Sequence, residues 1–158
     1  MKVSIICIGK IKERFFTDAI GEYKKRLSRF CDFEITEIPD LSIPDNASDS
    51  EKEQIKNREG EKILDKIKSN TFTIALCIEG KTLSSEDLAK TMANATQTTS
   101  HIAFVIGGSL GLSDAVKKKA DLMLSFGRMT LPHQLMRVVL TEQIYRSFMI
   151  NSNTGYHK

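Results

Sequence analysis

Hydrophobic residues follow two different periods along this chain. Short apolar runs typical of buried strands end at glycine, proline or polar residues. Between them lie longer segments with apolar residues every three or four positions, as in amphipathic helices. The predicted strands are residues 2–8, 33–38, 72–78, 102–106 and 122–124, and the predicted helices are 13–30, 51–68, 84–97, 113–120 and one that opens at 132. Alternating strands and helices predict an α/β fold, a mostly parallel sheet with helices on both faces.

Helix start signals support three of these boundaries. Ser48 with Glu51, and Ser84 with Asp87, have the spacing of capping boxes. Pro132 suits the first turn of the last helix. That helix is apolar over more than one face, so one face can dock on the sheet and the rest needs another cover. We therefore expect a homodimer formed through this helix.

Size and composition predict one domain, residues 1–158, with an ordinary hydrophobic fraction of 41% and a charged fraction of 27%. No apolar run reaches the roughly 18 residues of a membrane helix, and the apolar stretch at the N-terminus is too short for a signal peptide. We expect a cytoplasmic protein without membrane association. The three cysteines and three histidines show no metal-ligand spacing, so we expect no metal.

Basic residues give only a weak indication of a nucleic-acid partner. The net charge of +3 permits a nucleic-acid partner without requiring one. A face of the first helix carries Lys24, Lys25, Arg26 and Arg29, and a second basic run spans 117–119. Solvated helix surface is the favoured interpretation of both, with phosphate or RNA contact as the alternative.

Glycines mark the first candidate site. Gly107, Gly108 and Gly111 follow a strand and precede a helix, but form neither a Walker A motif nor a G-x-G-x-x-G fingerprint. A tight turn and a ligand-binding loop explain them equally well. The irregular stretch 126–131 precedes a helix, and its backbone could hydrogen-bond a flat ligand such as a purine.

Polar residues in the last helix and the tail form the second candidate site. Glu142 and Arg146 have the spacing of a helical salt bridge. Arg137 lies on a part of the helix that looks buried, so it needs an acidic partner or a phosphate. The tail after residue 151 would be frayed by default. Yet Tyr156 could stack on a base and His157 could handle a proton.

Together these segments resemble one family, the SPOUT-class ribosomal large-subunit methyltransferase H family. The resemblance rests on IGG-x-x-G-L, on LSFGRMTLPHQLMRVVLTEQIYR and on the terminal YHK. It extends to KVSIICIGKIKE, EYKKRL and LCIEGK, and so covers the whole chain.

The resemblance implies more than the pattern does. It implies a SPOUT-like fold with a C-terminal trefoil knot, whose cofactor-binding part spans about 72–158, and a homodimer that binds S-adenosyl-L-methionine. It also implies methylation of N3 of a pseudouridine in 23S rRNA of the large ribosomal subunit, on assembled ribosomes. The cofactor contacts it implies are Leu76, Gly107, Gly108, Phe126, Gly127, Arg128, Met129, Thr130 and Leu131.

Catalytic roles follow as hypotheses. Tyr156 would stack on or position the base, and His157 would handle the N3 proton or contact a phosphate. Arg137 would hold the nucleotide or a phosphate, and Glu142 would orient Arg137 or Arg146.

Two other functions stay open on the residues alone. The glycine loop could hold phosphate in a nucleotide-binding regulator, although the Walker lysine and nearby acidic metal ligands are missing. A ribosome-associated factor without activity could bind RNA with its basic helix, which would leave the glycine loop without a purpose. Binding of S-adenosylmethionine, of ATP or of neither separates the three.

Overall fold

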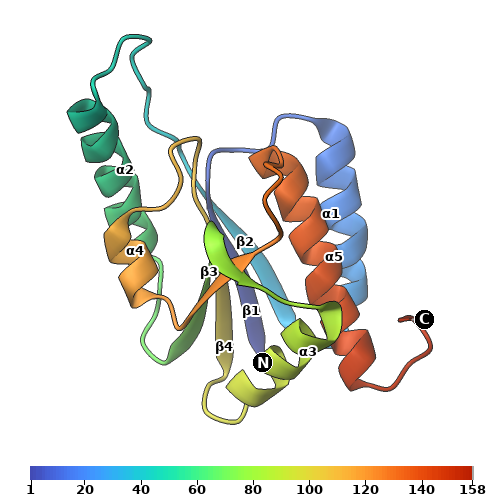
Figure 1. Cartoon of the computed structure of the whole chain (residues 1–158). Helices are drawn as coiled ribbons and strands as arrows, with labels where there is room; N and C mark the ends of the chain where they lie inside the picture. The colour runs from blue at the N-terminus through green and yellow to red at the C-terminus, as the bar shows by residue number, and fades with distance from the viewer. Residues whose placement is uncertain (158) are drawn as a thin grey trace.

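The computed structural model describes residues 1–157, and its centre is a five-stranded parallel sheet (Figure 1). The strand order is β2-β1-β4-β3-β5. Every neighbouring pair is parallel. The strands are β1 (Lys2–Ile8), β2 (Asp32–Ile38), β3 (Thr71–Thr82), β4 (His101–Ile106) and β5 (Leu122–Ser125). The predicted α/β fold with a parallel sheet is confirmed.

Five helices connect and follow the strands. They are α1 (Arg14–Leu27), α2 (Asp49–Leu64), α3 (Ser85–Ala95), α4 (Asp114–Lys119) and α5 (His133–Asn151). The two predicted capping boxes, at Ser48 and Ser84, are both present. Pro132 differs slightly from the prediction: its ψ of 136° places it at the N-cap rather than in the first turn.

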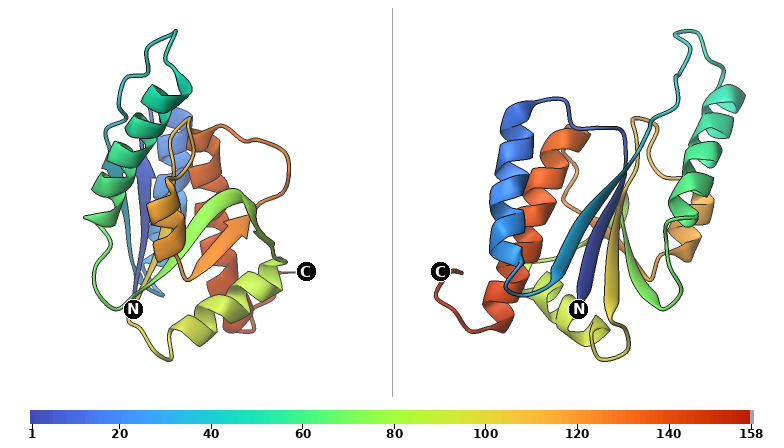
Figure 2. Two further views of the ribbon diagram at one scale, coloured as in Figure 1. Left: turned by 60° about the vertical axis from the view of Figure 1, so that its left-hand side comes forward. Right: turned by 180° about the vertical axis from the view of Figure 1, so that it is seen from behind.

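The helices cover both faces of the sheet, as predicted. Figure 1 and the rear view in Figure 2 show α2 and α4 on one face and α1, α3 and α5 on the other. Each face has its own buried core, a larger one under α1, α3 and α5 and a smaller one under α2 and α4. The alternation of side chains along each strand explains this division: Ile5 belongs to the larger core and Ile6 to the smaller one.

The main departure from the predicted boundaries occurs in β3. The strand runs beyond residue 78 to Thr82, because Lys81 and Thr82 pair again with β5 after an irregularity that follows Leu76. Parallel strands end at a common edge of the sheet, and ligands usually bind beyond that carboxyl edge. The ends of β3, β4 and β5 therefore meet where a site is expected.

Candidate functional site

A cavity of about 350 Å³ lies at the carboxyl edge of the sheet, within the size range of small-molecule sites. Its lining comes from the ends of three strands and the start of α5: Leu76–Glu79, Ile106–Gly108, Leu110–Leu112, Leu124–Gly127, Met129–Leu131, His133 and Met136, together with Lys56 and Lys117 from the helices of the other face. Three segments far apart in the sequence thus form one pocket. Of the predicted cofactor contacts only the exposed Arg128 lies outside this lining.

The glycine cluster forms one wall of the pocket. Gly111 donates its N–H to the carbonyl of Gly108 at 3.0 Å, and its φ is +81°. A Cβ on Gly107 would lie 2.7 Å from the backbone of Gly111. The cluster is therefore a tight turn that also lines the pocket, so the two interpretations of these glycines are compatible.

The segment between β5 and α5 forms a second wall. Gly127 has a φ of +115°, and its N–H donates to Ser125 Oγ at 3.1 Å. The apolar side chains of Phe126, Met129 and Leu131 remain exposed, Met129 to 86%. The segment thus brings its backbone to the pocket and leaves apolar surface uncovered beside it.

Charged residues occupy another part of the lining. Lys117 donates to the carboxylate of Glu79. This hydrogen bond raises the pKa of Lys117 and lowers the pKa of Glu79. Lys118 and Lys119 are exposed, as expected for solvated helix surface. Lys117 differs from that expectation, because its side chain is only partly exposed and lines the pocket.

Arg137 is fully buried, with 0% of its surface exposed. Its guanidinium donates to Glu37 Oε1 at 3.0 Å and to the carbonyls of Ile8 and Gly9 at 2.8 and 2.9 Å. Of the two predicted partners, the structure provides the acidic one. A side chain closed off in this way does not reach a phosphate in solvent, which corrects the expectation of a direct phosphate contact.

His133 links Arg137 to the pocket. Arg137 Nη2 donates to His133 Nδ1 at 3.2 Å, and the imidazole lines the cavity. Burial, and then the neighbouring guanidinium, lower the pKa of His133. The buried arginine therefore fixes the start of α5 against the loop after β1.

Glu142 and Arg146 are the centre of a separate group of side chains, which we call the C-terminal cluster and define as Glu86, Glu142, Arg146, Tyr156 and His157. Arg146 Nη2 donates to Glu142 Oε1 at 2.6 Å, so the predicted helical salt bridge is present. Tyr156 donates its hydroxyl to the same carboxylate oxygen at 3.3 Å. Burial and the Glu142 charge raise the pKa of Tyr156. Glu142 therefore joins the tail to α5.

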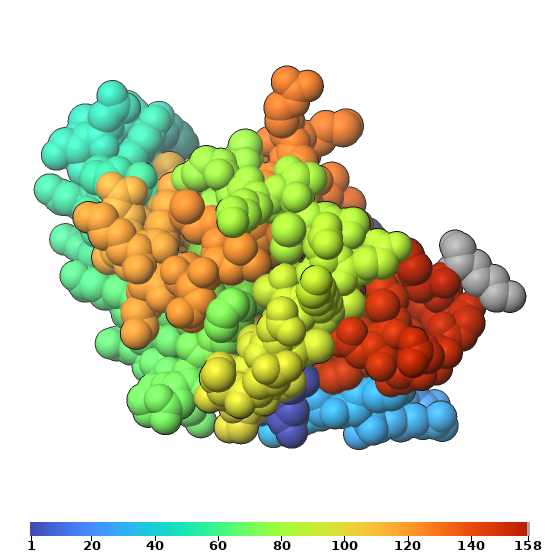
Figure 3. All heavy atoms as spheres, turned by 60° about the horizontal axis from the view of Figure 1, so that its bottom comes forward, coloured from blue at the N-terminus to red at the C-terminus, as the bar shows by residue number. Residues whose placement is uncertain are grey.

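His157 completes the cluster. Its Nδ1 accepts from Arg146 Nη1 at 3.3 Å, and its Nε2 lies 2.6 Å from Glu86 Oε1. The guanidinium of Arg146 lies over the Tyr156 ring, 4.9 Å from its centroid, and the ring of Tyr145 meets Tyr156 edge to face, with the centroids 5.1 Å apart. The tail to residue 157 is therefore docked rather than frayed. In Figure 3 the red C-terminal part of the chain lies beside the yellow-green atoms of α3.

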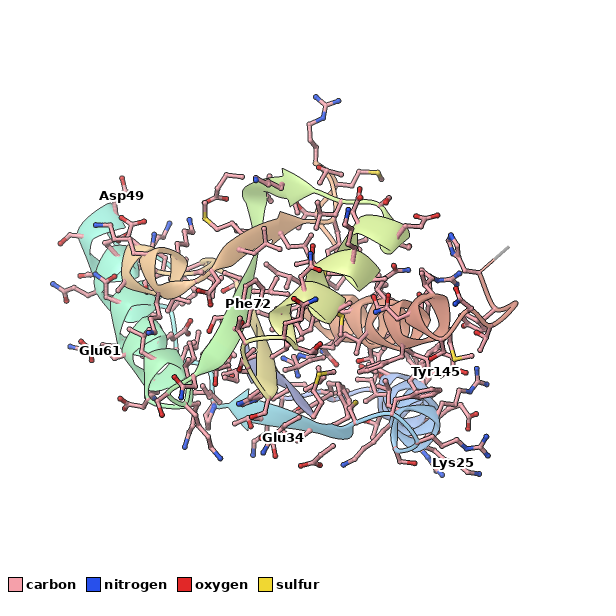
Figure 4. All side chains as sticks on the ribbon, turned by 90° about the horizontal axis from the view of Figure 1, so that it is seen from below. Lys25, Glu34, Asp49, Glu61, Phe72 and Tyr145 are labelled. Carbon is pink, nitrogen blue, oxygen red and sulfur yellow. The ribbon has the colours of Figure 1, made fainter. Side chains whose placement is uncertain are left out.

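Aromatic contacts extend from this cluster toward α1. Figure 4 labels Tyr145 between α5 and α1. Its ring lies 6.1 Å from that of Tyr23 and 5.9 Å from the guanidinium of Arg26. The predicted basic face of α1 thus adjoins the tail, although Arg26 itself already pairs with Glu22.

Sequence reasoning missed Glu37, Glu86 and His133. Glu37 and Glu86 meet their partners across 100 and 71 residues, and no local spacing indicates such contacts. His133 had a usable signal, because it opens a helix directly after a candidate ligand loop. Within residues 1–157, no three side chains are grouped as a metal site, and no helix is long and apolar enough to span a bilayer.

The comparison with solved structures concerns the fold. A solved structure of a probable methylase family protein from Haemophilus influenzae Rd KW20 superposes with a TM-score of 0.53, at 12% sequence identity. The match covers 99% of this chain and 70% of that one. At this identity the similarity shows the α/β fold alone.

The sequence comparison is more specific. The family model described as predicted SPOUT methyltransferase matches residues 1–157, and the chain belongs to this family. Proteins named ribosomal RNA large subunit methyltransferase H are similar over the full length of both chains, at 54% identity in Lactobacillus delbrueckii subsp. bulgaricus and 55% in Pediococcus pentosaceus and Clostridioides difficile.

Proposed function

We propose that this protein transfers a methyl group from S-adenosyl-L-methionine to N3 of a pseudouridine in 23S rRNA of the large ribosomal subunit, on assembled ribosomes. The names of the full-length relatives support an rRNA substrate. One structural observation supports the cofactor: Leu76, the glycine cluster and most of the segment 126–131 line a single pocket. A ribosomal substrate also implies a cytoplasmic protein.

The pocket suits the cofactor in shape and chemistry. Its glycines leave the backbone accessible, and its lining combines apolar side chains with a few polar ones, Ser125, Thr130 and His133, and one group of charged side chains. Leu76, Gly107, Gly108 and the segment 126–131 would hold the adenosine part. The cofactor supplies an already activated methyl group, so the protein must orient the acceptor and handle its proton.

The C-terminal cluster offers the groups for that task. Tyr156 can position the base by stacking, since one face of its ring already accepts the planar guanidinium of Arg146. His157 Nδ1 accepts from Arg146, so a shift of Arg146 toward the RNA would free this nitrogen to take the N3 proton. Glu142 orients Arg146. Arg137 would contribute indirectly, by holding His133 and the start of α5 beside the pocket.

A homodimer would bring the two sites together. Among the described residues, no member of the C-terminal cluster lines the pocket. Glu142 lies roughly 13 Å along the α5 axis from His133, at about 1.5 Å per residue. In one chain the two sites are therefore apart, and the exposed apolar Phe126, Met129 and Leu131 lack cover. Through the predicted α5 interface, the tail of one protomer would serve the pocket of its partner.

The trefoil knot is part of the proposal. The connection from β4 to β5 passes over β3 on the face of α2 and α4, and the chain then crosses to the opposite face to form α5. Such crossings are what a knot requires. Pulling the chain from both ends would test it, since a knotted chain stops short of the roughly 3.3–3.6 Å per residue of a fully extended one.

Calorimetry separates the proposal from its rivals. Binding of S-adenosylmethionine without ATP supports the methyltransferase. Binding of ATP alone would favour the nucleotide-binding regulator, and binding of neither would favour the ribosome-associated factor without activity.

The decisive experiment is mass spectrometry of 23S rRNA from cells that lack the protein. We expect one methylated pseudouridine to lose its methyl group, and the purified protein to restore it on intact ribosomes but not on protein-free rRNA. An unchanged set of rRNA methyl groups would overturn the proposal.

A further inference from the structure

The charged side chains of the pocket gather at one end. Lys56 comes from α2, Glu79 from the end of β3 and Lys117 from α4, and within residues 1–157 no other Lys, Arg, Asp or Glu lines this cavity. Helices α2 and α4 cover one face of the sheet, whereas the segment 126–131 leads into α5 on the other face (Figure 1). The pocket therefore has one charged end and one end of backbone and apolar groups.

Ion pairs hold these side chains in place. Lys117 Nζ donates to Glu79 Oε1, and the Lys117 side chain is 24% exposed. Lys56 Nζ lies 2.8 Å from Glu53 Oε2, and its side chain is similarly covered. Both cations are thus anchored beside the pocket rather than extended into solvent. The positive charges of both lysines favour the ionised form of the Glu79 carboxylate.

We propose that Glu79 and Lys117, assisted by Lys56, bind the α-amino-acid end of the cofactor. The inference rests on the proposed function and adds the residues that recognise this end. An α-amino acid carries a carboxylate and an ammonium next to each other. When the amino acid lies antiparallel to the Glu79–Lys117 pair, its carboxylate contacts the lysines and its ammonium contacts Glu79. The flat, uncharged adenosine fits the opposite end.

The mixed charge of this end argues for a zwitterion rather than an RNA phosphate. A phosphate carries only negative charge, so Glu79 would repel it while Lys117 attracted it. A zwitterion satisfies both groups at once. The lysines that lack this arrangement, Lys118 and Lys119, are exposed on the same helix.

Two adenosine compounds test the proposal by calorimetry on the full chain. S-adenosylhomocysteine keeps the amino-acid end, and 5′-methylthioadenosine lacks it. The wild-type protein should bind S-adenosylhomocysteine at least roughly tenfold more tightly, as one or two charge-assisted hydrogen bonds imply. Lys117→Ala and Glu79→Gln should each weaken the affinity for S-adenosylhomocysteine by about tenfold. Each should change the affinity for 5′-methylthioadenosine by less than about twofold.

The controls make each failure distinct. Lys118→Ala should change neither affinity, and unchanged 5′-methylthioadenosine binding shows that a variant is folded. Equal wild-type affinity for both compounds, or equal weakening of both by Lys117→Ala, would overturn the inference and leave the proposed function intact. If Lys117→Ala kept both affinities and lost ribosome binding, the lysine would serve RNA instead. Binding of neither compound to the wild type would overturn the proposed function and this inference with it.

Discussion

The pocket and the C-terminal cluster both include residues of α5, but the two sites differ in the kinds of groups that form them. The pocket is lined mainly by backbone and apolar side chains, with a charged group at one end, and is positioned by the ends of strands and by tight turns. The cluster consists of charged and aromatic side chains, joined by hydrogen bonds between α5, α3 and the tail. The pocket is built on the carboxyl edge of the sheet, whereas the cluster depends on a tail that packs against the outside of α5 and α3.

This difference indicates a division of labour. Groups fixed to a sheet suit the binding of a cofactor, because little has to move when it arrives. Groups held by exchangeable hydrogen bonds suit proton handling and contact with a large substrate. Changes in the two regions should therefore have separable effects, affinity for the cofactor in one case and turnover in the other.

Deletion of the tail should separate turnover from cofactor affinity most strongly. Deletion of residues 156–158 should reduce methyl transfer to ribosomes by about 10²–10⁴-fold, the usual contribution of a positioned proton-transfer group. Binding of S-adenosylhomocysteine should change by less than about threefold. Single-turnover assays and calorimetry on the same preparation check both values.

Two milder variants refine that result. Tyr156→Phe removes only the hydroxyl that donates to Glu142, and His157→Gln keeps the polarity but cannot take a proton at neutral pH. If the deletion transferred methyl groups at the wild-type rate, the proposed role of the tail would be abandoned.

The next effect contrasts two arginines of α5. Arg137→Met should lower the free energy of unfolding by about 2–4 kcal/mol, because the buried carbonyls of Ile8 and Gly9 and the Glu37 carboxylate lose their donor. Arg146→Met removes a partly exposed pair and should cost less than about 1 kcal/mol, yet slow turnover more.

Urea unfolding and the transfer assay give the two readouts. Equal stability losses for both variants would contradict the assignment of Arg137 to the fold and Arg146 to the cluster.

A smaller effect should come from the pocket wall. Gly127→Ala places a side chain at a φ of +115°, a strain of about 1–3 kcal/mol. The free protein should relieve this strain by moving the segment away from its pocket-lining conformation, and restoring that conformation on binding should weaken the affinity for S-adenosylhomocysteine by roughly 5–100-fold. Gly21→Ala is the matched control, since a Cβ there meets nothing within 4 Å in α1 and should stabilise the protein slightly. Unaltered affinity in Gly127→Ala would show that this segment adapts to the ligand.

The smallest effect concerns the docking of the tail. The pKa of Glu86 lies below its ordinary value, because its own backbone N–H and His157 donate hydrogen bonds to it. A lowered folded-state pKa means that the docking is complete above the ordinary pKa of 4.5 and is lost as the pH falls through the folded value. Glu86→Gln should mimic part of this loss at neutral pH.

Amide hydrogen exchange of residues 152–157 measures the docking. We expect protection to fall in acid and in Glu86→Gln, while protection of β4 stays unchanged. Equal loss in both regions would mean that acid unfolds the whole chain rather than the tail.

Much of the fold was predictable because its signals are local. The apolar runs and the capping boxes at Ser48 and Ser84 act within a few residues of the chain, so they fix helices and strands wherever these later pack. The glycine cluster and the segment 126–131 were likewise visible as interruptions between elements. The order of the strands was not, because β3 between β4 and β5 depends on the path of the connections.

The partner of each polar side chain depends on how the elements pack. Three consecutive lysines look alike in the sequence, and only the packing of α4 beside β3 turns Lys117 toward Glu79. Arg137 required a partner, and the fold supplied Glu37 from a strand 100 residues away. The helices, the strands and the two candidate regions follow from interactions between near neighbours along the chain. Contacts between distant residues, which arise only once the chain has packed, separated the pocket from the C-terminal cluster.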